Sequence, residues 1–214
     1  MKKRNYRRLC LSFCLILSFA IWTVLVSLVD VQPIGPNGSR VGLATLNRPI
    51  HGFIGTHPFL YTLTDWLGLV PIAVAFGFAA LGLVEWIKRK SLRRVDRSIF
   101  ILGAFYIVVI MVYVFFEAVV VNYRPVLING YLEASYPSST TMLVMCVMPT
   151  SIIELNGRIK SKIAKKIIAC AIKAFVVFMI IGRLASGVHW FSDIVGGALI
   201  SAALVVTYDA FASH

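Results

Sequence analysis

The stretch from Ser98 to Val121 reads SIFILGAFYIVVIMVYVFFEAVVV and carries no charged residue before Glu117. About 20 consecutive apolar residues in a helix cross the roughly 30 Å of hydrocarbon in a bilayer. The stretch therefore predicts a membrane-spanning helix, which satisfies its backbone hydrogen bonds internally. Composition agrees, because 59% of the 214 residues are hydrophobic and 14% are charged, against roughly a quarter charged in soluble domains.

Similar apolar runs recur and predict an all-α membrane protein, a six-transmembrane-helix bundle in one domain over residues 1–214. Pro71 and Pro149 fall within spans, where neighbouring helices re-satisfy the freed carbonyls. The basic N-terminus and first apolar run also fit a signal peptide, but no small-residue cleavage site precedes Asp30, which favours a retained helix. The predicted spans are residues 10–29, 66–87, 98–121, 138–155, 167–181 and 191–208.

Lysine and arginine are concentrated in three segments that hold 17 of the 21 basic residues. Each pair of these segments is separated by two predicted spans, so all three lie on one side, and cytoplasmic loops are the ones enriched in Lys and Arg. Both termini are therefore predicted in the cytoplasm. The net charge of +12 then reflects topology and contact with anionic lipid headgroups, and nucleic-acid binding is disfavoured. The residues are Lys2, Lys3, Arg4, Arg7, Arg8, Lys88, Arg89, Lys90, Arg93, Arg94, Arg97, Arg158, Lys160, Lys162, Lys165, Lys166 and Lys173.

The segment between the first two predicted spans, residues 30–65, starts rich in Gly and Pro and then turns apolar and aromatic. We expect it to lie along the outer membrane interface. All the cysteines fall in predicted spans without C-x-x-C spacing, so we interpret them as packing residues and not as disulfides or metal ligands. They are Cys10, Cys14, Cys146 and Cys170.

Polar residues gather at the two junctions predicted on the outer face, and polar groups at membrane depth indicate function. His189 and Asp193 are four residues apart, so a helix that begins near His189 would place them on one face. Asp193 is then expected to accept a hydrogen bond from one imidazole nitrogen and to leave the other free as a nucleophile or base. Arg183, six residues earlier, suits a phosphate dianion. The alternative is an interfacial histidine with Arg183 snorkelling to headgroups.

The other outer junction places Arg124-Pro125 after the third span and Ser138-Ser139-Thr140 at the start of the fourth. Hydroxyl residues at a helix N-terminus favour an anion site, although an ordinary N-cap explains them equally well. Together the two junctions predict a phosphate site. No carboxylate cluster accompanies it in the outer segments, so no metal is expected there.

These residues, in this order, resemble the type-2 phosphatidic acid phosphatase superfamily of integral membrane lipid phosphatases. The pattern of that family is Lys-x6-Arg-Pro, then Pro-Ser-Gly-His, then Ser-Arg-x5-His-x3-Asp. The third block is the most specific, and the resemblance covers about residues 117–197. The matching positions are Arg124-Pro125, Pro137-Ser138, Arg183, His189 and Asp193.

The resemblance implies metal-independent hydrolysis of a lipid phosphate or diphosphate, with no cofactor. His189 would attack phosphorus to form a phosphohistidine, and Asp193 would orient it. Arg183 and Arg124 would hold the phosphate oxygens. We expect a multi-pass protein of a bacterial cytoplasmic membrane whose site faces outward. The helix-start residues that would assist phosphate binding are Ser138, Ser139 and Thr140.

Two departures from the family pattern are informative. Glu117 stands where the family has its lysine, and it repels phosphate unless it pairs with Arg124 or Arg183. Thr140 stands where the family has a second histidine, the acid for the leaving group. General-acid help is worth ~10²–10⁴ in rate, so its loss favours leaving groups that are themselves phosphates, as in a polyprenyl diphosphate. Tyr123 is a possible modulating residue, and the candidates for a substitute acid are His51, His57, Tyr123, Glu133 and Tyr136.

Two functions therefore remain open from the sequence. The first is a lipid phosphatase. The second is a catalytically impaired member of the same family that binds or translocates phospholipid headgroups or acts as a membrane partner subunit.

Overall fold

The computed structural model describes residues 2–91 and 94–212, with side chains from Asn5 onward. Arg93 and the side chains of Lys2, Lys3 and Arg4, which entered the charge argument, lie outside the described residues. Extended pairing in the described part is limited to isolated bridges such as Gln32–Val41 and Tyr123–Ala134. The helices are α1 (Lys2–Leu28), the 3-10 turn η1 (Pro36–Gly38), α2 (Ala44–Ile54), α3 (Pro58–Leu67), α4 (Leu69–Arg89), α5 (Arg97–Ala118), α6 (Ser139–Arg158), α7 (Lys162–Ala185) and α8 (Phe191–Ala212).

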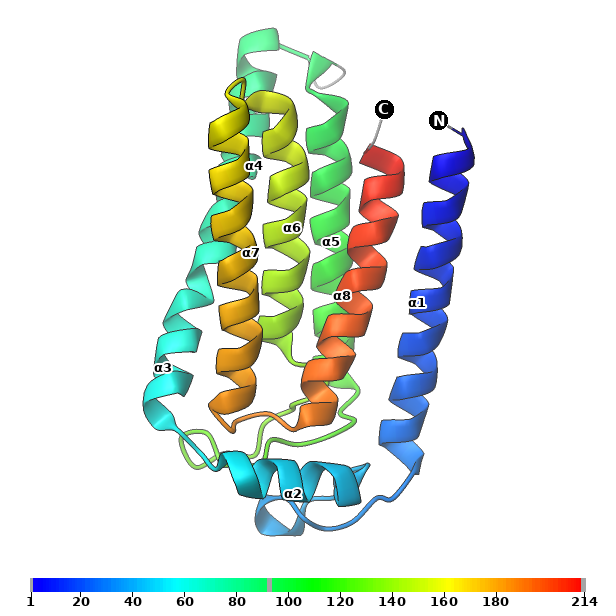
Figure 1. Cartoon of the computed structure of the whole chain (residues 1–214), viewed down its shortest axis with the longest axis vertical. Helices are drawn as coiled ribbons and strands as arrows, with labels where there is room; N and C mark the ends of the chain where they lie inside the picture. Colours follow the sequence, from blue (N-terminus) through cyan, green and yellow to red (C-terminus); the bar gives the residue numbers. More distant parts are fainter. Residues whose placement is uncertain (1, 92–93, 213–214) are drawn as a thin grey trace.

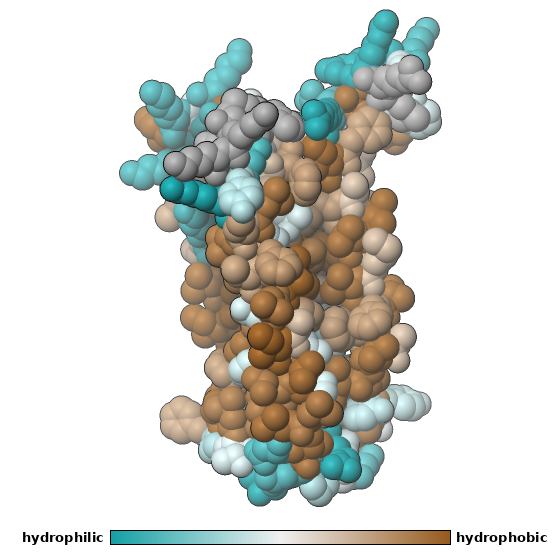
Figure 2. Space-filling view, turned by 90° about the vertical axis from the view of Figure 1, so that its right-hand side faces the viewer, coloured by the Kyte–Doolittle hydropathy of each residue, from teal (hydrophilic) through white to brown (hydrophobic). Residues whose placement is uncertain are grey.

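The long helices run side by side along one axis, and α2 lies across one end of the bundle (Figure 1). Both termini and the α4–α5 and α6–α7 connections lie at the opposite end. The α5–α6 and α7–α8 junctions therefore share the end that α2 covers. Figure 2 shows an apolar belt between two more polar ends, as expected for a protein whose middle contacts lipid.

Within the described residues, five helical stretches are long and apolar enough to cross a membrane: Asn5–Leu28, Pro58–Arg89, Arg97–Ala118, Lys162–Ala185 and Phe191–Ala212. This makes the chain an integral, multi-pass membrane protein. α6 is not among these stretches, because its polar residues lower its hydropathy. Several of these residues are buried, since α6 packs against α4, α5, α7 and α8. Its Glu154 is buried and accepts hydrogen bonds from Ser98 (3.0 Å) and from the Tyr208 hydroxyl.

Several element boundaries differ from the sequence prediction. The second span begins earlier than residue 66, because Pro58 occupies the first turn of α3, a position that suits proline. Residues 58–65 are thus helical and belong to the second candidate span, Pro58–Arg89. α2 does fit the interface expectation, with Phe53 93% exposed. α8 begins at Phe191, so His189 precedes the helix and does not open it.

The packing role expected of the cysteines holds only for Cys146, which is buried. Cys10, Cys14 and Cys170 are exposed on the bundle surface, and all of these thiols are free. Cysteine is apolar enough to face lipid, which explains why its position in a span did not indicate burial.

Close approach between α8 and the segment that leads into α6 depends on glycine. A Cβ at Gly196 would lie 2.5 Å from the ring of Tyr136, and one at Gly197 would lie 3.0 Å from the carbonyl of Ser138. This approach lets the Ser138 N–H donate a hydrogen bond to the carbonyl of Asp193 (3.0 Å). The absence of a side chain at Gly196 and Gly197 therefore allows the two junctions to lie this close together.

Gly196→Ala is expected to lower the stability of the folded protein by about 1–3 kcal/mol through overpacking against Tyr136. Thermal unfolding in detergent, followed by tryptophan fluorescence, measures the effect. Gly77→Ala is the matched control, since a Cβ at Gly77 meets nothing within 4 Å and alanine favours the helix. Equal melting temperatures for the two variants would contradict the packing argument.

Candidate active site

His189 lies in the short connection between α7 and α8 and is 3% exposed. Its Nδ1 is 3.0 Å from the hydroxyl oxygen of Ser135, which in turn donates a hydrogen bond to Oδ2 of Asp193 (2.6 Å). No direct hydrogen bond or ion pair joins His189 to Asp193 in the described part of the chain. The expectation that Asp193 contacts the imidazole directly is therefore wrong, because His189 precedes the helix and Ser135 fills the gap.

Four donors surround the carboxylate of Asp193, which is fully buried. Besides Ser135, they are the backbone N–H of Trp190 (3.0 Å), the side-chain amide of Asn122 (3.1 Å) and the hydroxyl of Ser192 (3.3 Å). Such a set stabilises the ionised form, which only accepts hydrogen bonds. The Ser135 hydroxyl hydrogen thus belongs to Asp193, and its oxygen accepts from His189 Nδ1–H. The proton therefore sits on Nδ1, and Nε2 carries the free electron pair.

Arg183 faces that electron pair. Its Nη2 lies 3.2 Å from His189 Nε2, and the guanidinium is 1% exposed at the end of α7. Residues of α3 hold it in place: Thr64 accepts a bond from Nη1 (3.4 Å), Asp65 forms an ion pair (3.8 Å), and the Tyr61 ring lies 5.3 Å from the guanidinium carbon. The site therefore draws on α3 as well as on the two junctions.

Arg124 comes from the α5–α6 segment and forms an ion pair with Glu133 (3.2 Å). Among the described residues, its Nη1 and the Nε of Arg183 are buried without a hydrogen-bond partner. Buried, unpaired donors on two cations are costly. An anion with several acceptor oxygens, such as phosphate, would satisfy them.

The hydroxyl residues at the start of α6, Ser138, Ser139 and Thr140, differ in what their side chains contact. Ser138 is fully buried, its N–H is bonded to Asp193, and its oxygen accepts a bond from Thr141 (3.0 Å). Ser139 lines a small cavity of about 10 Å³ together with His189. Thr140 does not line that cavity but borders an adjacent groove of about 360 Å³. Of these residues, only Ser139 directly faces the space next to the imidazole.

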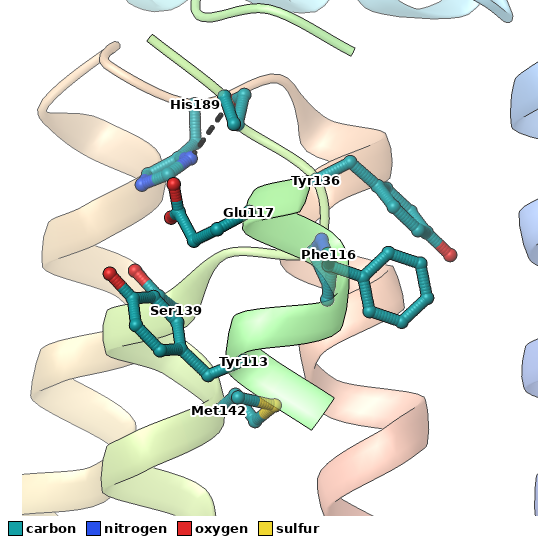
Figure 3. A pocket seen from close by; sticks show the side chains of 10 residues that line it. Tyr113, Phe116, Glu117, Tyr136, Ser139, Met142 and His189 are labelled. Atoms are coloured by element: carbon teal, nitrogen blue, oxygen red, sulfur yellow. Dashed lines mark hydrogen bonds between the residues drawn. The ribbon is translucent and has the colours of Figure 1, made fainter. Parts of the chain in front are cut away.

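Glu117 lies in the last turn of α5 and lines the cavity of His189. Figure 3 shows its carboxylate pointing toward the imidazole. Of the two arrangements open from the sequence, pairing with an arginine or facing elsewhere, the described residues show no ion pair of Glu117 with Arg124 or Arg183, whose ion pairs are with Glu133 and Asp65.

The other candidates for a proton donor are engaged elsewhere. His51 lies 3.0 Å from the carbonyl of Gly187, and His57 lies 2.9 Å from that of Ile54. The Tyr136 hydroxyl bonds to Thr23 on α1 (2.7 Å) and points away from His189 (Figure 3). Tyr123 contributes its carbonyl to Trp190 (2.8 Å). It lines neither the small cavity nor the groove beside Thr140.

Sequence reasoning missed Ser135 and Asn122, the residues that link the α5–α6 segment to Asp193. Ser135 is 54 positions from His189, so no local spacing points to it. Its only signal is its place beside the Tyr136-Pro137-Ser138 run. As for metals, the described residues contain no group of three or more His, Cys, Asp or Glu side chains that could hold an ion.

Comparison with known proteins places the chain in a family. The model of the PAP2 superfamily matches residues 72–212, so the chain belongs to the PAP2 superfamily. It is a phosphoric-ester hydrolase, and the family and membrane fold together support lipid phosphates as its substrates. The search of curated proteins finds no match.

A solved structure is similar over nearly the whole chain. It is the crystal structure of the first transmembrane PAP2-type phosphatidylglycerolphosphate phosphatase from Bacillus subtilis. The TM-score is 0.62 at 18% identity, and the match covers 94% of each chain. At this identity the similarity shows a shared fold.

Burial lowers the pKa of His189 well below its ordinary value, and the positive charges of Arg124 and Arg183 lower it further, while hydrogen bonding to Ser135 opposes the shift. The imidazole is therefore neutral at neutral pH and protonates only when the pH falls through that lowered pKa. At pH 5.5, where a free histidine is largely protonated, His189 is expected to remain neutral. Nitrogen-15 NMR of ring-labelled protein in detergent measures this, with His189→Gln to assign the signal. A His189 pKa at or above 6.5 would contradict the geometry.

Proposed function

We propose that the chain hydrolyses a lipid phosphate or diphosphate through a phosphohistidine on His189, and that a polyprenyl diphosphate is its favoured substrate. The neutral imidazole supports this role, because Ser135 fixes the proton on Nδ1 and leaves Nε2 as a nucleophile. Nε2 would attack phosphorus, and the lipid oxygen or lipid phosphate would leave. Water would then cleave the N–P bond and release phosphate.

The observation that carries the proposal is that both arginines of the site keep N–H groups without hydrogen-bond partners. Nη1 of Arg124 and Nε of Arg183 are buried without a hydrogen-bond partner. Phosphate oxygens would supply the missing acceptors. The same donors would stabilise the negative charge that develops in the transition state, and Ser139, which lines the cavity of His189 at the start of α6, would assist.

The lipid part of the substrate would lie in the groove beside Thr140. This groove shares Tyr113, Ser139 and Met142 with the cavity of His189, so the two spaces adjoin. The remaining lining is largely apolar: Leu69, Ile72, Val109, Ile110 and Leu143. An acyl or prenyl chain suits such a surface. Thr140 cannot donate a proton near neutral pH, which favours a phosphate over an alkoxide as the leaving group.

We further propose six membrane crossings, with α6 as the fourth, and a site at the outer face of a bacterial cytoplasmic membrane. The α7–α8 connection, which carries His189, lies at the end of the bundle opposite the termini and the basic α4–α5 and α6–α7 connections (Figure 1). The excess of lysine and arginine assigns those connections to the cytoplasm. The site would therefore face outward.

A second function has support from Glu117 and Thr140. A carboxylate in place of a cation and a hydroxyl in place of an acid also fit a protein that binds or translocates phospholipid headgroups, or serves as a partner subunit, without hydrolysis. The described arginines and His189 would then bind phosphate without turnover.

Purified protein in detergent with EDTA is expected to release phosphate from a polyprenyl diphosphate roughly tenfold or more faster than from phosphatidic acid, because a phosphate departs with little proton assistance whereas an alkoxide depends on it. His189→Ala is expected to abolish release from both. A colorimetric phosphate assay measures the rates.

Gly77→Ala protein, prepared in parallel, controls for handling, and size-exclusion profiles verify that His189→Ala remains folded. Comparable rates on the two lipids would contradict the diphosphate preference. Phosphate release that persists in His189→Ala, or no release by the native chain from any lipid phosphate, would reject the enzymatic proposal.

A further inference from the structure

Glu117 is an ionisable group that the proposed reaction has not yet used. It lines the cavity of His189 with Tyr113 and Ser139, and its carboxylate points at the imidazole (Figure 3). Tyr113, one helical turn earlier on the same face of α5, lines the same cavity. Within the described chain, neither arginine of the site forms an ion pair with it. The structure thus holds a carboxyl group at the nucleophile that serves no evident role in stabilising the fold.

The position of the leaving oxygen follows from the two adjoining spaces. The lipid would lie in the groove, and the groove meets the cavity at Tyr113, Ser139 and Met142. In an in-line displacement, the bond that breaks lies opposite His189 Nε2 and so points back toward the groove. Glu117 and Tyr113, on one face of α5, border the space where that bond breaks.

The other carboxylates near the site are engaged or lie farther from this position. Glu133 pairs with Arg124, Asp65 pairs with Arg183, and Asp193 is enclosed by four donors. Among the described residues that line the cavity, Glu117 is the one with a carboxyl group.

We propose that Glu117 is the general acid for the leaving group, an inference that rests on the proposed phosphatase function. As Nε2 of His189 bonds to phosphorus and the P–O bond to the lipid breaks, the protonated carboxyl of Glu117 transfers its proton to the departing oxygen. In the second step water attacks phosphorus and the N–P bond breaks. The Glu117 carboxylate takes the proton of that water and returns to its starting form.

A departing phosphate needs little proton assistance, whereas a departing alkoxide needs much. Glu117 would thereby allow slower turnover of monophosphates, while diphosphates stay the favoured substrates.

The test compares leaving groups in native and Glu117→Gln protein, with farnesyl phosphate (an alkoxide leaving group) and p-nitrophenyl phosphate (a phenolate that leaves unassisted). The variant is expected to lose about 10²–10⁴-fold in rate on farnesyl phosphate. It is expected to lose less than roughly tenfold on the aryl phosphate, since no general-acid contribution is lost there. Glu117→Asp should recover part of the loss on farnesyl phosphate. Activity on the aryl phosphate also shows that the variant is folded.

Glu85→Gln is the control, since Glu85 lies on α4 near Arg89, at the end of the bundle opposite His189. Equal losses on both substrates, or no loss on farnesyl phosphate, would overturn the assignment of Glu117 while leaving the phosphatase function in place. Absence of His189-dependent release by the native protein from both substrates would overturn the proposed function, and this assignment with it.

Discussion

The hydroxyl of Ser135, placed between His189 Nδ1 (3.0 Å) and Asp193 Oδ2 (2.6 Å), is the interaction on which the site depends. A carboxylate cannot donate, so the direction of each bond in this chain is determined. It fixes the tautomer of a buried imidazole and leaves Nε2 facing the guanidinium of Arg183 (3.2 Å). The choice of nucleophilic atom thus follows from the hydrogen bonds of Ser135, which itself lines the cavity of His189.

Holding these hydrogen bonds in place requires the end of the bundle that α2 covers to be rigid. Asn47 of α2 bonds to Ser192 through both its amide nitrogen (2.9 Å) and its oxygen (3.1 Å). Asn122 accepts from the N–H of Gly42 (3.1 Å) and donates to Asp193. A buried polar network whose members are satisfied specifies one arrangement. Arg124 and Arg183, in contrast, each keep a buried N–H group without a hydrogen-bond partner among the described residues. An anion bound beside them would supply the missing acceptors.

Much of this could be predicted from the sequence, because the signals were local or periodic. Apolar runs indicated the spanning helices, and the spacing of Arg183, His189 and Asp193 indicated the site. α6 corresponds to the predicted span 138–155, but its hydropathy is low for a membrane-spanning helix because it carries buried polar residues. The bridge through Ser135 and the pairing of Arg183 with Asp65 join residues 54 and more than 100 positions apart. Only the fold brings such residues together.

The central claim is that Nε2 of His189 becomes covalently bonded to phosphorus. Native protein incubated briefly with a ³²P-labelled lipid diphosphate and quenched in base is expected to retain label that is stable to alkali and lost in acid, as a phosphoramidate bond requires. Proteolysis should place that label on the peptide containing His189, and His189→Gln should carry none. Rapid phosphate release without any such labelled intermediate, or equal labelling of His189→Gln, would contradict it.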